Sequence, residues 1–167
     1  MRLFIAINFT DEIKDALSDV MDDMRAQGIY ANYVPAENLH LTLAFLGEMS
    51  PGDIPLIEEA MSQVAMPQIR ITLNGIGNFG NLLWAGLEEN RALGQYVRNL
   101  RRTLSEHGIP FDKKAFKPHI TLARKVETRK TFDVHVAPVS MTADGVSLMR
   151  SDRINNRMRY TELFFLS

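Results

Sequence analysis

Two histidine-containing segments of nearly identical sequence contain the candidate catalytic residues of this chain. Residues 40–44 read His-Leu-Thr-Leu-Ala, and residues 119–123 read His-Ile-Thr-Leu-Ala. Histidine titrates near neutral pH, so one ring can accept a proton while another donates one. Two imidazoles that face one site can therefore act as base and acid in a phosphate transfer, and each proton transfer typically contributes about 10²–10⁴-fold in rate.

Each segment also has a threonine two residues after its histidine. Residues two apart in a strand point to the same face, so His40 shares a face with Thr42, and His119 shares a face with Thr121. The two hydroxyls can donate hydrogen bonds to the non-bridging oxygens of a phosphate, where transition-state charge collects. The apolar residues between them are left to pack beneath a helix.

The two segments belong to a longer, approximate repeat. His119 lies 79 residues after His40, and the same offset relates further pairs: Leu3 and Leu82, Ala6 and Ala85, and Asp11 and Asn90, where two helices are expected to start. The apolar positions of these helices drift by one residue under this offset. A strand–helix–strand unit used twice indicates two lobes related by a pseudo-twofold axis, with their histidine faces meeting across a cleft.

Hydrophobic periodicity predicts the helices and strands that position the two segments. Spacing of 3.6 residues indicates a helix between a cap at Thr10 and a stop at Gly28, and another over residues 91–107. Capping residues favour a further helix from residue 51 to about 65. Strands are expected over residues 3–9, 39–46, 68–73, 82–87, 118–123, 134–136, 139–150 and 159–166. The expected fold is α+β: two lobes of mainly antiparallel sheet, with outer helices and an active-site cleft between them.

Composition limits the class of protein. The chain has 167 residues, of which 46% are hydrophobic, so it can bury a core. Its net charge of −1 requires any anion site to be local, and the lack of cysteine excludes disulfides and thiol chemistry. The first apolar run is too short for a signal peptide, and no run reaches the roughly 18 residues of a membrane span. We expect a soluble, cytoplasmic monomer with no membrane partner.

The sequence around the two segments resembles that of a known enzyme family. The tetrads at residues 40–43 and 119–122 are similar to the HxTx motif of the 2H phosphoesterases. Residues 2–7, 38–47, 83–86 and 116–124 resemble the bacterial and archaeal RNA 2′,3′-cyclic phosphodiesterases, also called 2′-5′ RNA ligases. The resemblance implies one 2H phosphoesterase domain over residues 1–167, built of two interleaved lobes. It also implies metal-independent hydrolysis of RNA 2′,3′-cyclic phosphate ends to 2′-phosphates, and reversible 2′-5′ RNA joining.

The resemblance further implies individual roles. His40 would donate a proton to the 3′ oxygen, His119 would accept one from water, and Thr42 and Thr121 would hold the phosphate. Arg124 also matches the family pattern and could clamp a phosphate, although strand parity turns it toward the core unless the strand ends or bulges. The residues alone do not decide which histidine is the acid, because the two copies look alike.

Other functions stay open at this point. The chain could bind RNA ends without turnover, or act on another small cyclic phosphate. We expect RNA or oligonucleotide ends as the partner, and no cofactor and no metal, because the H-x-T spacing lacks the ligand pattern of a zinc site.

Several remaining patterns favour structural roles. Residues 75–80 match G-x-G-x-x-G, but a strand rather than a helix follows, so we predict a loop joining strands and not a dinucleotide site. His107 is interpreted as a cation at a helix end, and His135 as structural because no threonine follows it at the motif position. Of three aromatics that could stack a terminal base, Phe45 and Trp84 are expected in the core, leaving Phe79.

Basic residues near the motifs have two possible interpretations. The arginines are Arg150, Arg153, Arg157 and Arg159, and the lysines before the second motif are Lys113, Lys114 and Lys117. Such runs are mostly solvated surface. The alternative is a local basic rim for an RNA backbone, which an otherwise neutral RNA-binding protein needs.

Overall fold

In the part of the chain that the structure describes, three α-helices lie between strands, and four strands follow the last helix. A computed structural model describes residues 1–127 and 131–167. Its elements are β1 (Arg2–Asn8), α1 (Asp11–Ala26), β2 (Asn32–Tyr33), β3 (His40–Glu48), α2 (Ile54–Ser62), β4 (Ile69–Phe79), β5 (Leu82–Leu87), α3 (Arg91–Glu106), β6 (Ile120–Arg124), β7 (Ser140–Ala143), β8 (Val146–Ile154) and β9 (Arg157–Leu166). Short 3₁₀ turns precede β3 (Ala36–Asn38) and α2 (Pro51–Asp53).

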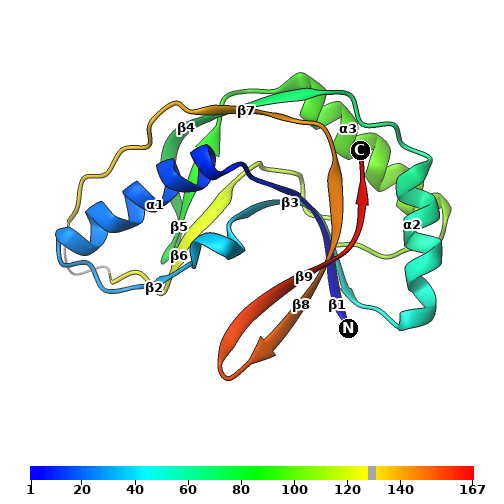
Figure 1. Cartoon of the computed structure of the whole chain (residues 1–167), viewed down its shortest axis with the longest axis horizontal. Coiled ribbons are helices and arrows are strands. Elements are labelled where there is room, and N and C mark those ends of the chain that lie inside the picture. Colours follow the sequence, from blue (N-terminus) through cyan, green and yellow to red (C-terminus); the bar gives the residue numbers. More distant parts are fainter. Residues whose placement is uncertain (128–130) are drawn as a thin grey trace.

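The strands form two antiparallel sheets with corresponding orders (Figure 1). One sheet has the order β3-β1-β8-β9, and the other has the order β2-β6-β5-β4-β7. In each sheet, the motif-bearing strand pairs with the first strand of its repeat unit: β3 with β1, and β6 with β5. The predicted α+β fold with two mainly antiparallel sheets is therefore confirmed.

The helices of the two repeat units are exchanged between the sheets. The chain leaves β1 for α1, but α1 contacts β6 of the other sheet, and α3, which follows β5, contacts β3. Figure 1 shows α1 beside β5 and β6, and α3 toward the opposite end of the molecule. Buried residues of both sheets and of all three helices belong to one hydrophobic cluster. Each sheet is thus covered by the helix of the other unit.

Caps and periodicity explain why the two long helices form where they do. The Thr10 hydroxyl accepts a hydrogen bond from the backbone N–H of Ile13 (3.5 Å), and the Asn90 side chain accepts one from Leu93 (3.0 Å). The apolar residues at 3.6-residue spacing are buried in both helices: Ile13, Ala16, Leu17, Val20, Met21 and Met24 in α1, and Leu93, Tyr96, Val97, Leu100 and Leu104 in α3. Both helices have 16 residues and start 80 residues apart. That offset, one more than the 79 of the motifs, accounts for the drift in their apolar positions.

The structure corrects several expected boundaries. Residues 134–136 form no strand, and the strand expected over residues 139–150 is two strands, β7 and β8, separated by Asp144 and Gly145. The loop predicted over residues 75–80 is wrong, because β4 continues to Phe79. Its glycines serve the sheet: Gly77 lies against the Trp84 ring of β5, and Gly80, at φ +58°, makes the turn between the two strands.

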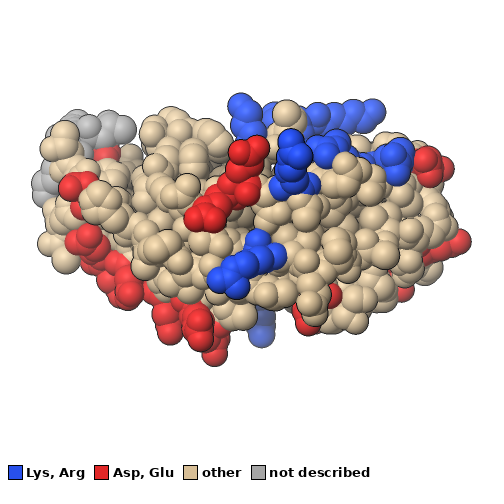
Figure 2. Space-filling view, turned by 90° about the horizontal axis from the view of Figure 1, so that it is seen from above, with Lys and Arg blue, Asp and Glu red and all other residues tan. Residues whose placement is uncertain are grey.

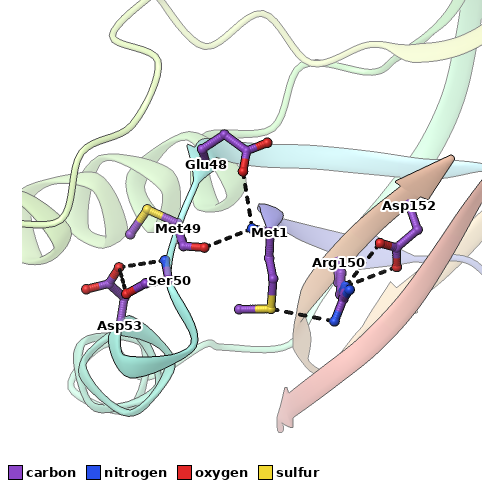
Figure 3. A network of polar contacts seen from close by, with 7 residues as sticks. All are labelled: Met1, Glu48, Met49, Ser50, Asp53, Arg150 and Asp152. Atoms are coloured by element: carbon purple, nitrogen blue, oxygen red, sulfur yellow. Dashed lines mark hydrogen bonds and ion pairs between the residues drawn. The ribbon is translucent and has the colours of Figure 1, made fainter.

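A polar network ties β1, β3 and β8 together at one end (Figure 3). The Met1 ammonium group donates to Glu48 Oε2 (3.2 Å) and to the carbonyl oxygen of Met49 (3.0 Å). Arg150 pairs with Asp152 (3.0 Å) and also donates to Met1 Sδ (3.6 Å). One arginine of the basic cluster found in the sequence is therefore neutralised by a neighbouring carboxylate.

No helix in the described parts of the chain is long and apolar enough to cross a membrane.

Replacing Gly77 by alanine should destabilise the fold. A Cβ at this position would overlap the indole ring of Trp84, so we expect the free energy of unfolding to fall by about 1–3 kcal/mol, as for other overpacked sites. Urea denaturation followed by circular dichroism measures the change.

Gly94→Ala provides the matched control, because a Cβ there meets only the flexible end of Arg98 at 3.5 Å, inside α3. It should stabilise the protein by about 0.5–1 kcal/mol. Equal behaviour of the two variants would show that the close approach of Trp84 to Gly77 is not required.

Candidate active site

The two histidine motifs open onto one cleft. The cleft has a volume of about 660 Å³, and its walls come from both sheets, α3 and the segment before β6. All five residues selected from the sequence line it: His40, Thr42, His119, Thr121 and Arg124. The structure therefore brings together the groups that the repeat placed 79 residues apart.

Backbone carbonyls hold both imidazoles in the same way. His40 Nδ1 lies 2.7 Å from the carbonyl oxygen of Asn38, and His119 Nδ1 lies 2.7 Å from that of Lys117, which is the equivalent residue in the second copy. A carbonyl oxygen only accepts, so Nδ1 carries the hydrogen in each ring. Nε2 is then the atom left for proton transfer, and in His40 it lies 2.9 Å from the Thr42 hydroxyl.

The two rings differ in their surroundings. Burial lowers the pKa of His40 below its ordinary value, and the positive charges of Arg124 and His119 act in the same direction. The hydrogen bond to the Asn38 carbonyl opposes this shift. In the substrate-free protein the neutral form of His40 is therefore favoured, and a bound anion would oppose this shift by offsetting the nearby positive charges.

Aromatic rings pack against both histidines. The His40 ring has Phe4 at 4.8 Å and Tyr160 at 5.1 Å between centroids, and the Tyr160 ring is nearly perpendicular to it. The His119 ring has Phe79 at 5.1 Å and Trp84 at 6.4 Å. Each imidazole is thus restrained by two rings from other strands. The sequence did not identify Phe4 and Tyr160 as site residues, because each was assigned only to an expected strand, over residues 3–9 and 159–166.

A β-bulge at equivalent positions of the two copies alters which residues face the cleft. Pairing of β1 with β3 passes from Ile5–Ala44 to Ala6–Thr42, which leaves Leu43 as the extra residue. Pairing of β5 with β6 passes from Leu83–Ala123 to Trp84–Thr121, which leaves Leu122 as the extra residue. A bulge shifts the alternation of side chains by one position.

The bulge decides the orientation of the next residue in each copy. Phe45, expected in the core, is instead 41% exposed and lines the cleft, and Arg124 also lines it although uninterrupted strand parity would turn it inward. Phe79 is 45% exposed and lines the cleft as well, whereas Trp84 is partly buried behind it. Phe45 and Phe79 therefore offer the cleft two accessible aromatic surfaces.

Arg101 of α3 joins the two motif segments, and sequence reasoning did not find it. Its guanidinium donates to the carbonyl oxygen of Leu43 through Nη2 (2.9 Å) and Nε (3.2 Å), and to that of Lys114 through Nη1 (2.8 Å). Leu43 is the bulge residue three positions after His40, and Lys114 lies five positions before His119. The equivalent bulge carbonyl, of Leu122, accepts from the backbone N–H of Val34 (2.9 Å).

The cleft is basic although the chain as a whole is not. Within the described residues its lining has four cationic side chains, those of Arg101, Lys114, Lys117 and Arg124, and one carboxylate, that of Asp112. The two long helices also differ in charge: α1 carries six carboxylates and two cations, whereas α3 carries four arginines and one glutamate. In the face seen in Figure 2, most Lys and Arg side chains gather along one edge, and Asp and Glu follow another.

The two other histidines lie outside the cleft lining. His107, at the C-terminal end of α3, has its Nδ1 2.9 Å from the carbonyl oxygen of Thr103, and His135 is exposed and lies 3.2 Å from Asp133. Across residues 1–127 and 131–167, no group of three or more His, Cys, Asp or Glu side chains is arranged to hold a metal ion.

Known proteins are similar to this chain in sequence and in fold. A family model for the 2′-5′ RNA ligase superfamily matches residues 13–155. The RNA 2′,3′-cyclic phosphodiesterase of Thermotoga maritima is 37% identical over 131 residues, covering 74% of this chain and 70% of that protein. The Escherichia coli protein of the same name is 30% identical over 168 residues, covering 97% and 93%. The crystal structure of E. coli LigT complexed with 3′-AMP superposes with a TM-score of 0.86 at 30% identity, covering 99% of this chain and 96% of that one.

Removing the guanidinium of Arg101 should destabilise the protein. Arg101→Met leaves the carbonyl of buried Leu43 without its donor, so we expect the free energy of unfolding to fall by about 1–3 kcal/mol. Arg98→Met is the control on the same helix, because Arg98 donates to the exposed Gln95, and it should change stability by less than about 0.5 kcal/mol. Urea unfolding that gives the same loss for both variants would contradict the bridging role of Arg101.

Proposed function

The chain belongs to the 2′-5′ RNA ligase superfamily, and from this premise we propose how it acts as an RNA 2′,3′-cyclic phosphodiesterase: two histidines open the cyclic phosphate to a 2′-phosphate. One observation carries the proposal. Both HxT motifs line one cleft, and the same Nδ1–carbonyl hydrogen bond in each copy leaves Nε2 of each ring for proton transfer.

The proposed reaction uses water and the two imidazoles. His119 Nε2 accepts a proton from water as the water oxygen bonds to phosphorus. The bond from phosphorus to the 3′ oxygen breaks, and His40 donates its proton to that oxygen, giving a 2′-phosphate and a 3′-hydroxyl. The family resemblance supports this assignment of acid and base, whereas the hydrogen bonds of the two rings are equivalent. With an RNA 5′-hydroxyl in place of water, the same steps form a 2′-5′ linkage, and their reversal cleaves it.

Three further side chains are proposed to hold the phosphate. Thr42 and Thr121 offer hydroxyl donors, and Arg124 offers a guanidinium whose charge also acts on His40. Arg124 has no cationic counterpart in the first copy, where Phe45 stands. This difference supports unequal roles for two motifs that are otherwise alike.

We also propose that one chain suffices and that it works in the cytoplasm as a monomer, with residues 1–167 acting as a single domain of two interleaved lobes. A single chain supplies both histidines, and the exchanged helices leave neither sheet with a complete core of its own. Binding of RNA ends without turnover and hydrolysis of another small cyclic phosphate are the competing functions.

The reaction can be tested with a nucleoside 2′,3′-cyclic phosphate in excess chelator. We expect a 2′-phosphate as the product, identified by chromatography against both isomers. A 3′-phosphate would overturn the leaving-group assignment. RNA binding without turnover of any cyclic phosphate would favour the binding function instead.

His40→Ala and His119→Ala should each lower the rate about 10²–10⁴-fold. His107→Ala is the matched control, because His107 lies outside the cleft lining, and it should keep the activity of the original protein. Circular dichroism of each variant verifies that it is folded. Near-full activity of either cleft variant would contradict two-histidine catalysis.

The pH profiles should report the environment of His40. A general acid must be protonated, so activity falls as the pH rises through its pKa, and the lowered pKa of His40 moves this alkaline limb of kcat/KM to lower pH than an ordinary histidine would give. Bound phosphate raises the pKa of His40, so the alkaline limb of kcat should lie at higher pH than that of kcat/KM. Coincident limbs would contradict this assignment.

Arg124→Gln provides the matched test of that cause. It removes a positive charge that lowers the pKa of His40, so the alkaline limb of kcat/KM should move to higher pH even though the rate falls. An unmoved limb would show that the limb does not arise from His40.

A further inference from the structure

The β8–β9 hairpin forms one wall of the cleft and continues beyond it. Ser151 and Tyr160 line the cleft and are paired directly across the two strands. Figure 1 shows the hairpin projecting away from the rest of the molecule. Its tip is exposed, so the surface next to the cleft wall is open to a ligand that extends out of the cleft.

The register of the hairpin decides which arginines face the ligand. Pairing is regular from Met149–Glu162 to Ile154–Arg157, and side chains two residues apart share a face. Arg153, paired with Met158, is therefore on the same face as Ser151 and Tyr160, one step beyond them. Arg157 lies on the opposite face of the hairpin.

Arg153 also has an available charge. Its side chain is exposed, and no ion pair holds it in the described part of the chain. Asp152, the nearest acid in sequence, is paired with Arg150. Arg159 sits across from Asp152 on the other face. A cation without a protein partner, on the face that continues the cleft, is suited to an anion supplied by the substrate.

The spacing places Arg153 next to the cleft. Two strand residues span about 6.6–6.8 Å, so Arg153 lies one such step beyond Ser151, which lines the cleft. With the cyclic phosphate between the histidines, the next phosphate of the RNA is the 5′ phosphate of the same terminal nucleotide. We propose that Arg153 binds this second phosphate and that Met158, 37% exposed beside it, packs against the adjoining nucleoside. The inference rests on the proposed function and extends it: the preferred substrate is an oligonucleotide end rather than a single nucleoside.

Two substrates separate this site from the catalytic site. One is a nucleoside 2′,3′-cyclic phosphate, and the other is a dinucleotide with the same terminal cyclic phosphate. Arg153→Ala should lower kcat/KM on the dinucleotide about five- to tenfold, mostly through KM, and leave the nucleoside substrate within about twofold. It should also reduce the slope of log kcat/KM against log salt by about 0.7 on the dinucleotide. Arg153→Lys, which retains the charge, should recover part of the loss.

Arg157→Ala is the matched control, because it removes the same charge from the opposite face of the same hairpin. It should leave both substrates near the original values. Equal losses of kcat/KM on the dinucleotide in Arg153→Ala and Arg157→Ala would overturn the site, because they would indicate a general electrostatic effect of the positively charged hairpin. Turnover of both substrates at equal efficiency by the original protein would also overturn it, while leaving the proposed function intact.

Binding gives a readout that does not need turnover. In a His119→Ala background, isothermal titration with the dinucleotide should show weaker affinity when Arg153 is also replaced by alanine, and unchanged affinity when Arg157 is replaced. Unchanged affinity in the Arg153 variant would overturn the inference whatever reaction the protein catalyses.

Discussion

The hydrogen bond between Nδ1 of each cleft histidine and the carbonyl oxygen two residues before it constrains the whole site. It fixes the tautomer and directs Nε2 of His40 and His119 to proton transfer. Since the bond is the same in both copies, it makes the rings equivalent and cannot by itself assign an acid and a base. The difference arises around them: His40 is the ring whose pKa burial lowers, and a cation stands at Arg124 where the first copy has Phe45.

The exchange of helices makes this geometry a property of the whole fold. Each sheet is covered by the helix of the other repeat unit, so the two motif strands belong to one continuous core. Arg101 adds a direct link, because one guanidinium bonds the bulge carbonyl of Leu43 and the carbonyl of Lys114 in the segment that leads to His119. The distance between the two imidazoles therefore depends on packing far from the cleft.

Local patterns were sufficient to predict the long helices, most strands and the five cleft residues taken from the motifs. Periodicity and caps depend on near neighbours, so α1 and α3 were found with their buried positions correct. The bulges at Leu43 and Leu122 could not be predicted, because a shift in strand pairing has no signal in the residue types. Phe45 was therefore wrongly expected in the core. Phe4, Tyr160 and Arg101 reach the site only through sheet order and helix exchange, which no local pattern records.

The opposite charges of α1 and α3 give the molecule an electric dipole that its net charge conceals. With six carboxylates on α1 and four arginines on α3, toward opposite ends of the fold, a chain of net charge −1 still carries its charges unevenly. A polyanion that approaches from solution is turned by this field, repelled at one end and drawn toward the other. Long-range steering of this kind raises the rate of productive encounters and weakens as salt screens it.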